Sequence, residues 1–393
     1  MECKRCGNKD PTYFYKGHKG LYCRKCVSFK RTLLDEELEP LDYEISKEVS
    51  EYSFKYPLTI YQEEISVKCL EYVKDYDILL HCVCGAGKTE IVVRSIADYL
   101  DRGLKVCYAI SRKEVVKELY LRFKEIFPFA KVIALYGGHH DEIIGDLIIC
   151  TTHQLYRYYK TFDLLILDEV DAFPLSGNKE LMNIAINSAR GHIIFSTATV
   201  NDFLHKVISN RKIKELKLYL RPSLKPLIVP RIIYGPKYFL FIYLFTLMRK
   251  MTNQCIIFVT SKKEARLYYE IYKLFFLCTY AHAELKDGSK NIQDFKDKKY
   301  KFIFATTVLE RGITIKDVNV IILCFKKRIF NEENLVQMLG RVGRNFNNPY
   351  GYAYILSNHY DKNILKAKET IIEANQEYEM SILRQRNKPL QSL

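Results

Sequence analysis

The sequence predicts an α/β protein with parallel sheets, organised as two tandem domains behind a small four-cysteine module. Short apolar runs alternate with helical patterns across residues 56–218, and the alternation resumes across residues 219–393. Continuous apolar runs separated by helical stretches are typical of parallel strands that are buried on both faces. Two Cys-x2-Cys pairs lie ahead of both regions, within residues 1–32.

Composition narrows the class of protein. The 393 residues are enough for two or three domains. Hydrophobic residues make up 48% and charged residues 27%, as in a folded globular chain rather than a disordered one. The formal net charge of +15 favours a polyanionic partner. Several of the 12 cysteines lie in apolar runs, which indicates buried thiols in a reducing compartment rather than a disulfide framework.

The most apolar stretch is residues 238–248. It is far shorter than the roughly 20 residues that a membrane-spanning helix needs. We therefore predict a buried helix here, with contact to a membrane surface as the alternative. The N-terminus has no apolar core of the kind found in signal peptides.

The N-terminal module predicts a zinc site. Cys3 and Cys6 are separated by two residues, as are Cys23 and Cys26, and sixteen residues lie between the pairs. Two such pairs can present four sulfurs to one tetrahedral ion. A segment of this size cannot bury a core, so metal binding would supply about 10–16 kcal/mol toward its folding. His18 lies between the pairs, and we expect it in a solvent-facing loop rather than as a ligand.

The same module is strongly basic. Between residues 2 and 31 there are nine basic and two acidic residues, and aromatic residues are interleaved with them: Tyr13, Phe14, Tyr15 and Tyr22. Aromatic faces beside lysines suit single-stranded bases, but these rings could equally pack around the cysteine pairs. The acidic range 33–55 predicts a connector, with room for a short helix and with its charges solvated.

A P-loop follows the apolar run 78–80. Its phosphate-binding residues would be Gly85, Ala86, Gly87, Lys88 and Thr89. Glycines allow backbone N–H groups to converge on phosphate oxygens. The lysine would reach the β- and γ-phosphates, and the threonine hydroxyl would bind Mg²⁺. A helix starting near Thr89 would direct its positive end at the anion. The first motif position is Cys82, where glycine or alanine is usual, and the simpler alternative is a glycine turn between a strand and a helix.

Further polar residues frame this motif. Gln62, ahead of the P-loop, has an amide that suits an adenine edge. Asp168 and Glu169 follow a buried apolar run, 80 residues after Lys88. The aspartate would hold Mg²⁺ and the glutamate would activate the attacking water; the alternative is a solvated acidic turn. Strands are predicted at 106–110, 131–135, 147–150, 164–167 and 192–195.

The second domain begins at three prolines, residues 222, 226 and 230, that predict a hinge. Strands are predicted at 255–259, 302–305 and 320–323. The segment 337–344 contains Gln337, Arg341 and Arg344. The two arginines are three residues apart, so on a helix or its first turn they would share a face. Their planar guanidinium groups match a γ-phosphate, and a glycine-rich basic turn is the alternative.

These motifs, in this order, resemble superfamily 2 helicases and translocases of the DEAD/DEAH type. The resemblance rests on Gln62, the P-loop, the Asp168–Asp171 tetrad, the Ser196–Thr199 segment and residues 337–344. It implies two RecA-like domains, and it implies that Ser196 and Thr197 link nucleotide state to domain closure. It also implies nucleic-acid contacts, for which a capping or turn role is the alternative, at Arg112, Thr152, His153, Gln154, Thr306 and Thr307. Residues 310–314 look like the motif that relays closure to the bound strand.

With its zinc module in front, the chain resembles the ComFA-type late competence ATPases, and more distantly the helicase core of the primosomal restart protein. The resemblance implies ATP, Mg²⁺ and Zn²⁺ as cofactors, and a translocase or helicase that drives import of single-stranded DNA. It also implies protein partners in an uptake machinery, a cytoplasmic location with peripheral contact at the inner face of the membrane, and scope for oligomers.

The domains expected are a zinc module (1–32), a connector (33–55) and two RecA-like domains (56–218 and 219–393). Two other functions stay open on the sequence: an RNA helicase with the same engine, and a zinc-dependent DNA-binding scaffold with weak ATPase activity.

Overall fold

The computed structural model describes residues 1–46, 48–139, 142–285, 287–309, 315, 317–326, 329–346 and 348–386. The chain divides into two compact units, residues 1–82 with 87–218, and residues 83–86 with 219–393. Each unit is built on one parallel sheet, as the sequence predicts.

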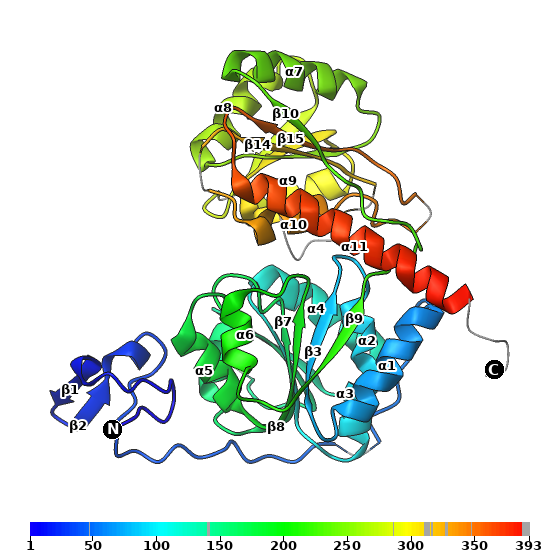
Figure 1. Cartoon of the computed structure of the whole chain (residues 1–393). Helices are drawn as coiled ribbons and strands as arrows, with labels where there is room; N and C mark the ends of the chain where they lie inside the picture. The colour runs from blue at the N-terminus through cyan, green and yellow to red at the C-terminus, as the bar shows by residue number, and fades with distance from the viewer. Residues whose placement is uncertain are drawn as a thin grey trace. The chain divides into compact units, whose positions relative to one another are not determined.

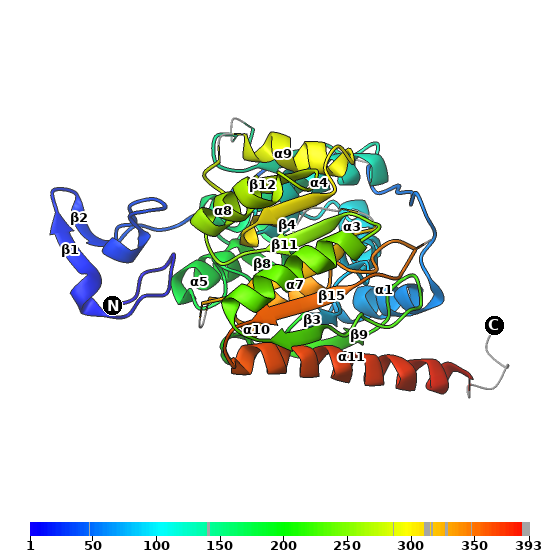
Figure 2. The same ribbon diagram turned by 90° about the horizontal axis from the view of Figure 1, so that it is seen from above.

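The first unit includes the N-terminal module. A two-stranded antiparallel hairpin ends at Cys23, and a short 3-10 helix then carries Cys26. Figures 1 and 2 show the module beside helix α5 (Lys179–Ser188). Its elements are η1 (Pro11–Tyr13), β1 (Phe14–Gly17), β2 (Gly20–Cys23) and η2 (Arg24–Cys26). The small module therefore packs on α5, where Ile184 shares one core with the four cysteines.

The connector carries no helix among its described residues, 33–46 and 48–55, so the short helix allowed by the sequence does not form. Side chains of the first unit bind its backbone instead. Leu41 N–H donates to Thr161 Oγ1 at 3.1 Å, and Ser46 N–H donates to Asp146 Oδ1 at 2.7 Å. An extended segment satisfied in this way has no need of intrahelical hydrogen bonds.

The sheet of the first unit has seven strands in the order β5-β6-β4-β7-β8-β3-β9, with every neighbouring pair parallel. All five strands predicted for this region form, with ends that differ by up to three residues. The strands are β3 (Asp77–Cys82), β4 (Val106–Ile110), β5 (Val132–Leu135), β6 (Leu147–Thr151), β7 (Phe162–Asp168), β8 (Ala189–Thr197) and β9 (Ile213–Leu218).

Helices cover both faces of this sheet because successive residues of each buried strand point to opposite sides. Figure 1 shows α5 and α6 on one side of the sheet and α1, α2 and α3 on the other. The helices besides α5 are α1 (Ile60–Tyr72), α2 (Lys88–Ile91), α3 (Val93–Asp101), α4 (Lys113–Ile126), η3 (Thr152–Arg157) and α6 (Asp202–Ile208).

The second unit has a six-stranded sheet in the order β10-β15-β14-β11-β13-β12, again parallel throughout. One core packs α7 and α8 against the sheet, and a second core packs α9, α10 and α11 against the other face. The strands are β10 (Arg231–Tyr234), β11 (Cys255–Phe258), β12 (Cys278–Ala281), β13 (Phe302–Ala305), β14 (Asn319–Cys324) and β15 (Ala353–Ser357). The helices are α7 (Lys237–Lys250), α8 (Lys262–Tyr272), α9 (Gly288–Lys296), η4 (Thr307–Leu309), α10 (Glu332–Leu339) and α11 (Lys362–Arg386).

Helix α7 contains the apolar stretch 238–248. We predicted a buried helix here, but only one face of it is buried. Leu240, Leu244 and Met248 face the core, whereas Tyr238 and Ile242 are largely exposed. Positions four apart share one face of a helix, so a stretch that is apolar all round leaves some of its residues in solvent. No helix among the described residues is long and apolar enough to cross a membrane.

Candidate functional site

Three predicted motifs meet at the carboxyl edge of the first sheet. Strands β7, β8 and β3 are neighbours, with Asp168 paired in register with Ser196 and Ser196 with Leu80. Because parallel strands all end at the same edge, the residues that follow them gather there. The P-loop follows β3, the acidic tetrad follows β7, and the Ser196–Thr199 segment ends β8.

The P-loop glycines adopt a left-handed backbone, with φ of +83° at Gly85 and +82° at Gly87. A Cβ at Gly87 would also meet Gln62 Nε2, so a side chain there would displace the Gln62 amide. Gln62 is held at this position by a capping box at the start of α1, in which its Oε1 accepts the Thr59 N–H at 3.0 Å. The structure therefore brings Gln62 to the P-loop, as the sequence predicts.

Helix α2 begins at Lys88, one residue before the position we expected, and it makes a single turn before α3. The Nζ atom of Lys88 lies 4.0 Å from Asp168 Oδ1. Cys82, the unusual first residue of the motif, is fully buried, and burial raises the pKa of its thiol to about 12. It acts as a small apolar side chain at the end of β3.

Asp168 is fixed by two hydroxyl groups. Tyr108 Oη, from β4, donates to Asp168 Oδ2 at 2.7 Å, and Ser196 Oγ donates to Oδ1 at 2.8 Å. Burial, together with the charge of Asp168, raises the pKa of Tyr108 well above its usual value. The neighbouring side chain of Thr89 acts in the opposite direction and lowers the pKa of Tyr108. Sequence reasoning missed Tyr108, because a tyrosine inside an apolar run is usually core.

The acidic turn after Asp168 has a strained backbone. Glu169 has φ of +54°, a region that residues other than glycine seldom adopt and that clusters at functional sites. Its N–H donates to Asp168 Oδ1 at 2.9 Å. Thr199 Oγ1 donates to Asp171 Oδ2, also at 2.9 Å. The end of β8 is thus tied to the acidic turn at two points, through Ser196 and through Thr199.

The donor set at this edge fits a magnesium nucleotide. Asp168 accepts a hydrogen bond from Tyr108, and Thr89 acts on the pKa of the same tyrosine, so one hydroxyl and one carboxylate lie close together. Oxygen ligands of these two kinds are those that Mg²⁺ prefers. The left-handed glycines leave the P-loop backbone without side chains where phosphates would approach.

In the second unit, the arginines of segment 337–344 do not lie on a helix. Helix α10 ends at Leu339, and the chain turns through Gly340 and Gly343, which has φ of +69°. Arg341 is 2% exposed, whereas Arg344 is partly exposed and its Nε donates to Gly340 O at 2.9 Å. The two arginines therefore lie on a turn after the helix, with Arg341 buried and Arg344 partly exposed, rather than on the shared helical face that we expected.

An arginine that the sequence analysis missed fixes this turn. Arg221, almost fully buried, donates to the carbonyl of Gly340 at 2.8 Å and to that of Val342 at 2.6 Å. Burial, followed by the charge of Arg344, lowers its pKa to about 10. Gln337 is buried on α10 just before the turn. No motif in the sequence points to Arg221, because its partners are backbone atoms.

The residues predicted to touch nucleic acid follow strand ends in both units. Arg112 is the N-cap of α4, and Thr306 and Thr307 follow β13. Thr152 is fully buried at the start of η3, whereas the next residue, His153, is exposed. The relay segment 310–314 lies outside the described residues.

The two cysteine pairs come together as one cluster. The Sγ atoms of Cys3, Cys6, Cys23 and Cys26 all lie within 4.8 Å of one another and are buried. Cys3 Sγ is 3.5 Å from Cys26 Sγ, and Cys6 Sγ is 3.8 Å from Cys23 Sγ. A tetrahedral ion with Zn–S bonds of about 2.3 Å separates its sulfurs by about 3.8 Å. The cluster therefore fits one zinc ion, and the exposed His18 lies at the surface.

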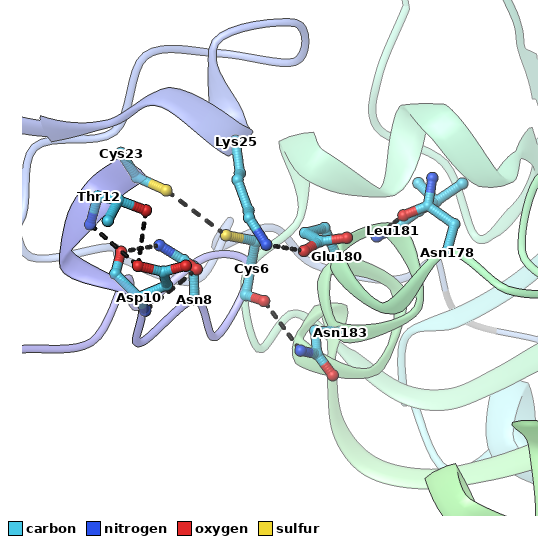
Figure 3. Close-up of polar contacts among 10 residues, drawn as sticks. All are labelled: Cys6, Asn8, Asp10, Thr12, Cys23, Lys25, Asn178, Glu180, Leu181 and Asn183. Atoms are coloured by element: carbon cyan, nitrogen blue, oxygen red, sulfur yellow. Dashed lines mark hydrogen bonds and ion pairs between the residues drawn. The ribbon is translucent and has the colours of Figure 1, made fainter. Parts of the chain in front are cut away.

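Helix α5 holds the module from outside the cluster. Figure 3 shows Lys25 reaching Glu180 of α5, and Asn183 of the same helix donating to Cys6 O, at 2.9 Å. Asn187 donates to Arg5 O at 3.0 Å. These amides bind the backbone of the first cysteine pair, so the module and α5 share a structured contact within the first unit.

Comparison with known proteins agrees with this architecture. The family model for DEAD/DEAH box helicases matches residues 59–207, and that for the helicase conserved C-terminal domain matches residues 237–346. Competence protein ComFA of Streptococcus pneumoniae is 32% identical over 95% of this chain and 90% of that protein. The chain belongs to the ComFA family. ComFA of Bacillus subtilis is also 32% identical, over 95% of this chain and 85% of that protein.

The fold has a counterpart among solved structures. Dbp5 of S. cerevisiae, solved bound to RNA and ADP BeF3, matches with a TM-score of 0.62 and 17% identity over 82% of this chain and 88% of that one. This likeness shows the fold, two RecA-like domains. Membership of the ComFA family, with both helicase domains, makes the chain a nucleic-acid-dependent ATPase of superfamily 2 that acts in competence, and it implies ATP and Mg²⁺.

Proposed function

We propose that this ComFA-family ATPase moves along single-stranded DNA and so drives the import of transforming DNA. The observation that carries the proposal is the cluster at the carboxyl edge of the first sheet, where Lys88, Asp168 and Ser196 lie together. It is supported by the net charge of +15, which favours a polyanion. The two relatives that match at 32% identity over 95% of this chain are competence proteins.

The residues of the first edge would divide the chemistry among them. The P-loop backbone and Lys88 bind the nucleotide phosphates, and Thr89 with Asp168 hold Mg²⁺, which neutralises phosphate charge. Glu169 orients the attacking water and accepts its proton. Gln62, next to Gly87, hydrogen-bonds the adenine edge.

The hydrogen bonds around Asp168 would couple the bound nucleotide to the end of β8. Because Ser196 donates to Asp168 and Thr199 donates to Asp171, a shift of the acidic turn on hydrolysis would move the end of β8. In the second unit, Arg344 would meet the γ-phosphate during hydrolysis, with Arg341 and Gln337 supporting the turn. Hydrolysis then alternates two conformations of the ATPase and advances it along the strand.

Contacts with the strand would come from the segments after the strand ends. Arg112, His153 and Gln154 of the first unit, and Thr306 and Thr307 of the second, carry donors suited to a phosphate backbone. Thr152 is buried, so it would contribute only after a local rearrangement. These groups do not distinguish DNA from RNA, since that requires reading the 2′-hydroxyl. The competing function is therefore that of an RNA helicase, with the same two ATPase domains acting on RNA.

The N-terminal module would bind one zinc ion through its four cysteines. A structural zinc site is closed to substrate and stabilises its fold, which suits a module that presents basic and aromatic residues. Substitution of all four cysteines by serine distinguishes two functions of the module, binding of the DNA strand and docking of a partner protein. Lost DNA affinity favours strand binding, whereas unchanged DNA affinity with lost complex formation favours docking of an uptake-machinery protein.

Tyr238 and Ile242 are exposed on α7, a helix that begins at Lys237 and ends at Lys250. We infer that this face makes the peripheral contact with the inner membrane surface, since apolar side chains flanked by lysines suit anionic lipid.

ATP hydrolysis by the purified chain tests the main proposal. It is measured alone, with single-stranded DNA and with single-stranded RNA at one salt concentration, because affinity for the backbone falls steeply with salt. Strong stimulation by DNA and little by RNA supports the proposal, and the Lys88→Ala variant should be inactive with both. Equal or RNA-biased stimulation contradicts DNA specificity, and full activity of Lys88→Ala contradicts the assigned site.

A further inference from the structure

A hollow of about 750 Å³ lies where the four-cysteine module meets η3 of the ATPase unit. Tyr13, Lys25 and Phe29 line it from the module, and His153, Gln154 and Tyr156 line it from η3. Module and η3 are both parts of the first unit. His153 and Gln154 are also the residues that the sequence predicted to contact nucleic acid.

Aromatic rings from both sides gather at the hollow. The Phe29 ring stacks on the His153 ring at 6.0 Å between centroids and lies 6.3 Å from the Tyr156 ring. Tyr13 is 42% exposed, and Lys25 Nζ lies 4.5 Å from its ring centroid. Although His153 is exposed as a whole, Phe29 covers one side of its ring, and the loss of water there lowers its pKa, so the ring is uncharged near neutral pH. Flat uncharged rings that are open to solvent are platforms on which bases stack.

The charge around the hollow suits a nucleic-acid strand. Glu180 is the one carboxylate among the lining residues, and it is paired with Lys25. Further basic residues of the module remain nearby in sequence, including Arg24, Lys30 and Arg31. Gln154 and Asn178 add amide groups, which bind base edges or phosphate oxygens. Rings and amides on a module that is basic overall form the combination that suits single-stranded nucleic acid.

The contact that shapes the hollow is built from backbone groups. Asn183 and Asn187 of α5 bind the carbonyls of Cys6 and Arg5, and Arg5 donates from Nη1 to Tyr156 O at 3.2 Å. These bonds place the module against η3 without using the sulfur ligands. The rings of the module and of η3 are therefore held in place before any nucleic acid binds. This lowers the entropy that binding would lose by ordering them.

We propose that this hollow binds one nucleotide of the translocated single strand, with its base against the rings of Tyr13, Phe29 and His153. The module then extends the strand-binding surface that begins at Gln154, and zinc acts on DNA binding by shaping one wall of the hollow. This inference rests on the proposed function, because it names a binding subsite for the same strand.

Binding of two labelled strands tests the inference. One is an oligothymidylate of about 16 nucleotides, long enough for a single-strand site, and the other is an abasic strand of equal length. The wild-type chain should prefer the strand with bases by about tenfold or more. Tyr13→Ala should lose about five- to tenfold in affinity for oligothymidylate, with little change for the abasic strand, because only stacking is removed.

Two matched variants control the result. Tyr13→Phe keeps the ring and should bind as the wild type does. Tyr15→Ala removes an exposed ring of the same module that does not line the hollow, and it should also bind normally. Gln154→Ala, combined with Tyr13→Ala, should cost less than the sum of the two single changes, because both residues would contact one nucleotide.

The outcomes separate this inference from the function on which it rests. Wild-type affinity of Tyr13→Ala for oligothymidylate, or an equal loss for both strands, overturns the hollow as a base-binding subsite. Equal losses from Tyr15→Ala and Tyr13→Ala overturn it as well. A wild-type chain that binds neither strand contradicts the proposed function itself. Zinc content, measured on every variant, should stay at one ion per chain; loss of zinc from Tyr13→Ala would show that the ring supports the module instead.

Discussion

The carboxyl edge of the first sheet and the turn after α10 in the second unit hold their polar groups by different means. At the first edge, side chains bind side chains, since Tyr108 and Ser196 both donate to Asp168. At the turn, the buried Arg221 binds the backbone carbonyls of Gly340 and Val342. The first arrangement fixes one carboxylate, whereas the second fixes the path of the chain that carries Arg341 and Arg344.

This difference separates two kinds of requirement. The first edge needs particular residue types, because its hydrogen bonds end on a carboxylate that would also hold a metal ion. The turn needs one arginine from elsewhere in the chain, Arg221. The groups that accept its hydrogen bonds are backbone carbonyls, which are present whatever the side chains of the turn are. Substitutions in the two regions should therefore fail in different ways, with lost chemistry at the first edge and lost geometry at the turn.

The largest effect is expected at Arg344. Arg344→Ala should lower strand-stimulated ATP hydrolysis by about 10³- to 10⁵-fold, because an arginine at the γ-phosphate contributes on that scale. Arg344→Lys should recover only part of the loss, since lysine keeps the charge but not the planar fork. Steady-state kinetics measure the effect, and Arg249→Ala, an exposed arginine at the end of α7, is the control. Near-normal activity of Arg344→Ala would show that the turn takes no part in ATP hydrolysis.

Glu169 should come next. Glu169→Gln should reduce kcat by about 10²- to 10⁴-fold, the usual contribution of a general base, while nucleotide binding is retained because Gln keeps the size of the side chain. Kinetics together with binding of a fluorescent ATP analogue make the measurement. Glu114→Gln, an exposed change on α4, should behave as the wild type. Parallel loss of binding and kcat would instead point to a structural role for the strained turn.

Arg221 tests the geometric requirement. Arg221→Met should destabilise the second unit by about 1–3 kcal/mol for each buried carbonyl that it leaves unpaired, and kcat should fall because the turn loses its support. Thermal unfolding and ATPase assays follow both effects. The matched change Arg231→Met, at an exposed position on β10, should leave both unaltered. A stable variant with normal kcat would show that the turn needs no such anchor.

The smallest effect is expected at Tyr108. Tyr108→Phe removes one hydrogen bond to Asp168, which is worth about 1 kcal/mol, and should raise the Mg²⁺ concentration required for half-maximal activity. Tyr99→Phe is the control, because Tyr99 is a buried tyrosine that donates to Val73 O at 3.2 Å, outside this network. If both variants shift the Mg²⁺ requirement equally, Tyr108 has no special place beside Asp168.

The same contrast explains what the sequence could predict. The two parallel sheets and the meeting of the P-loop, Asp168 and Ser196 follow from apolar runs and from the common edge of parallel strands. Tyr108 and Arg221 escaped prediction because one lies in an apolar strand and the other binds only backbone. The segment with Arg341 and Arg344 was expected to be helical because the spacing of the two arginines does not show that α10 ends at Leu339.

Translocation itself tests the central claim most directly. A single-stranded oligonucleotide carries biotin with bound streptavidin at one end, and ATP-dependent displacement of the streptavidin is followed over time. We predict displacement from DNA by the wild-type chain with ATP, none with a non-hydrolysable analogue, and none by Glu169→Gln. Rapid ATP hydrolysis stimulated by the same strand, with no displacement from either end, would contradict the claim that hydrolysis moves this protein along DNA.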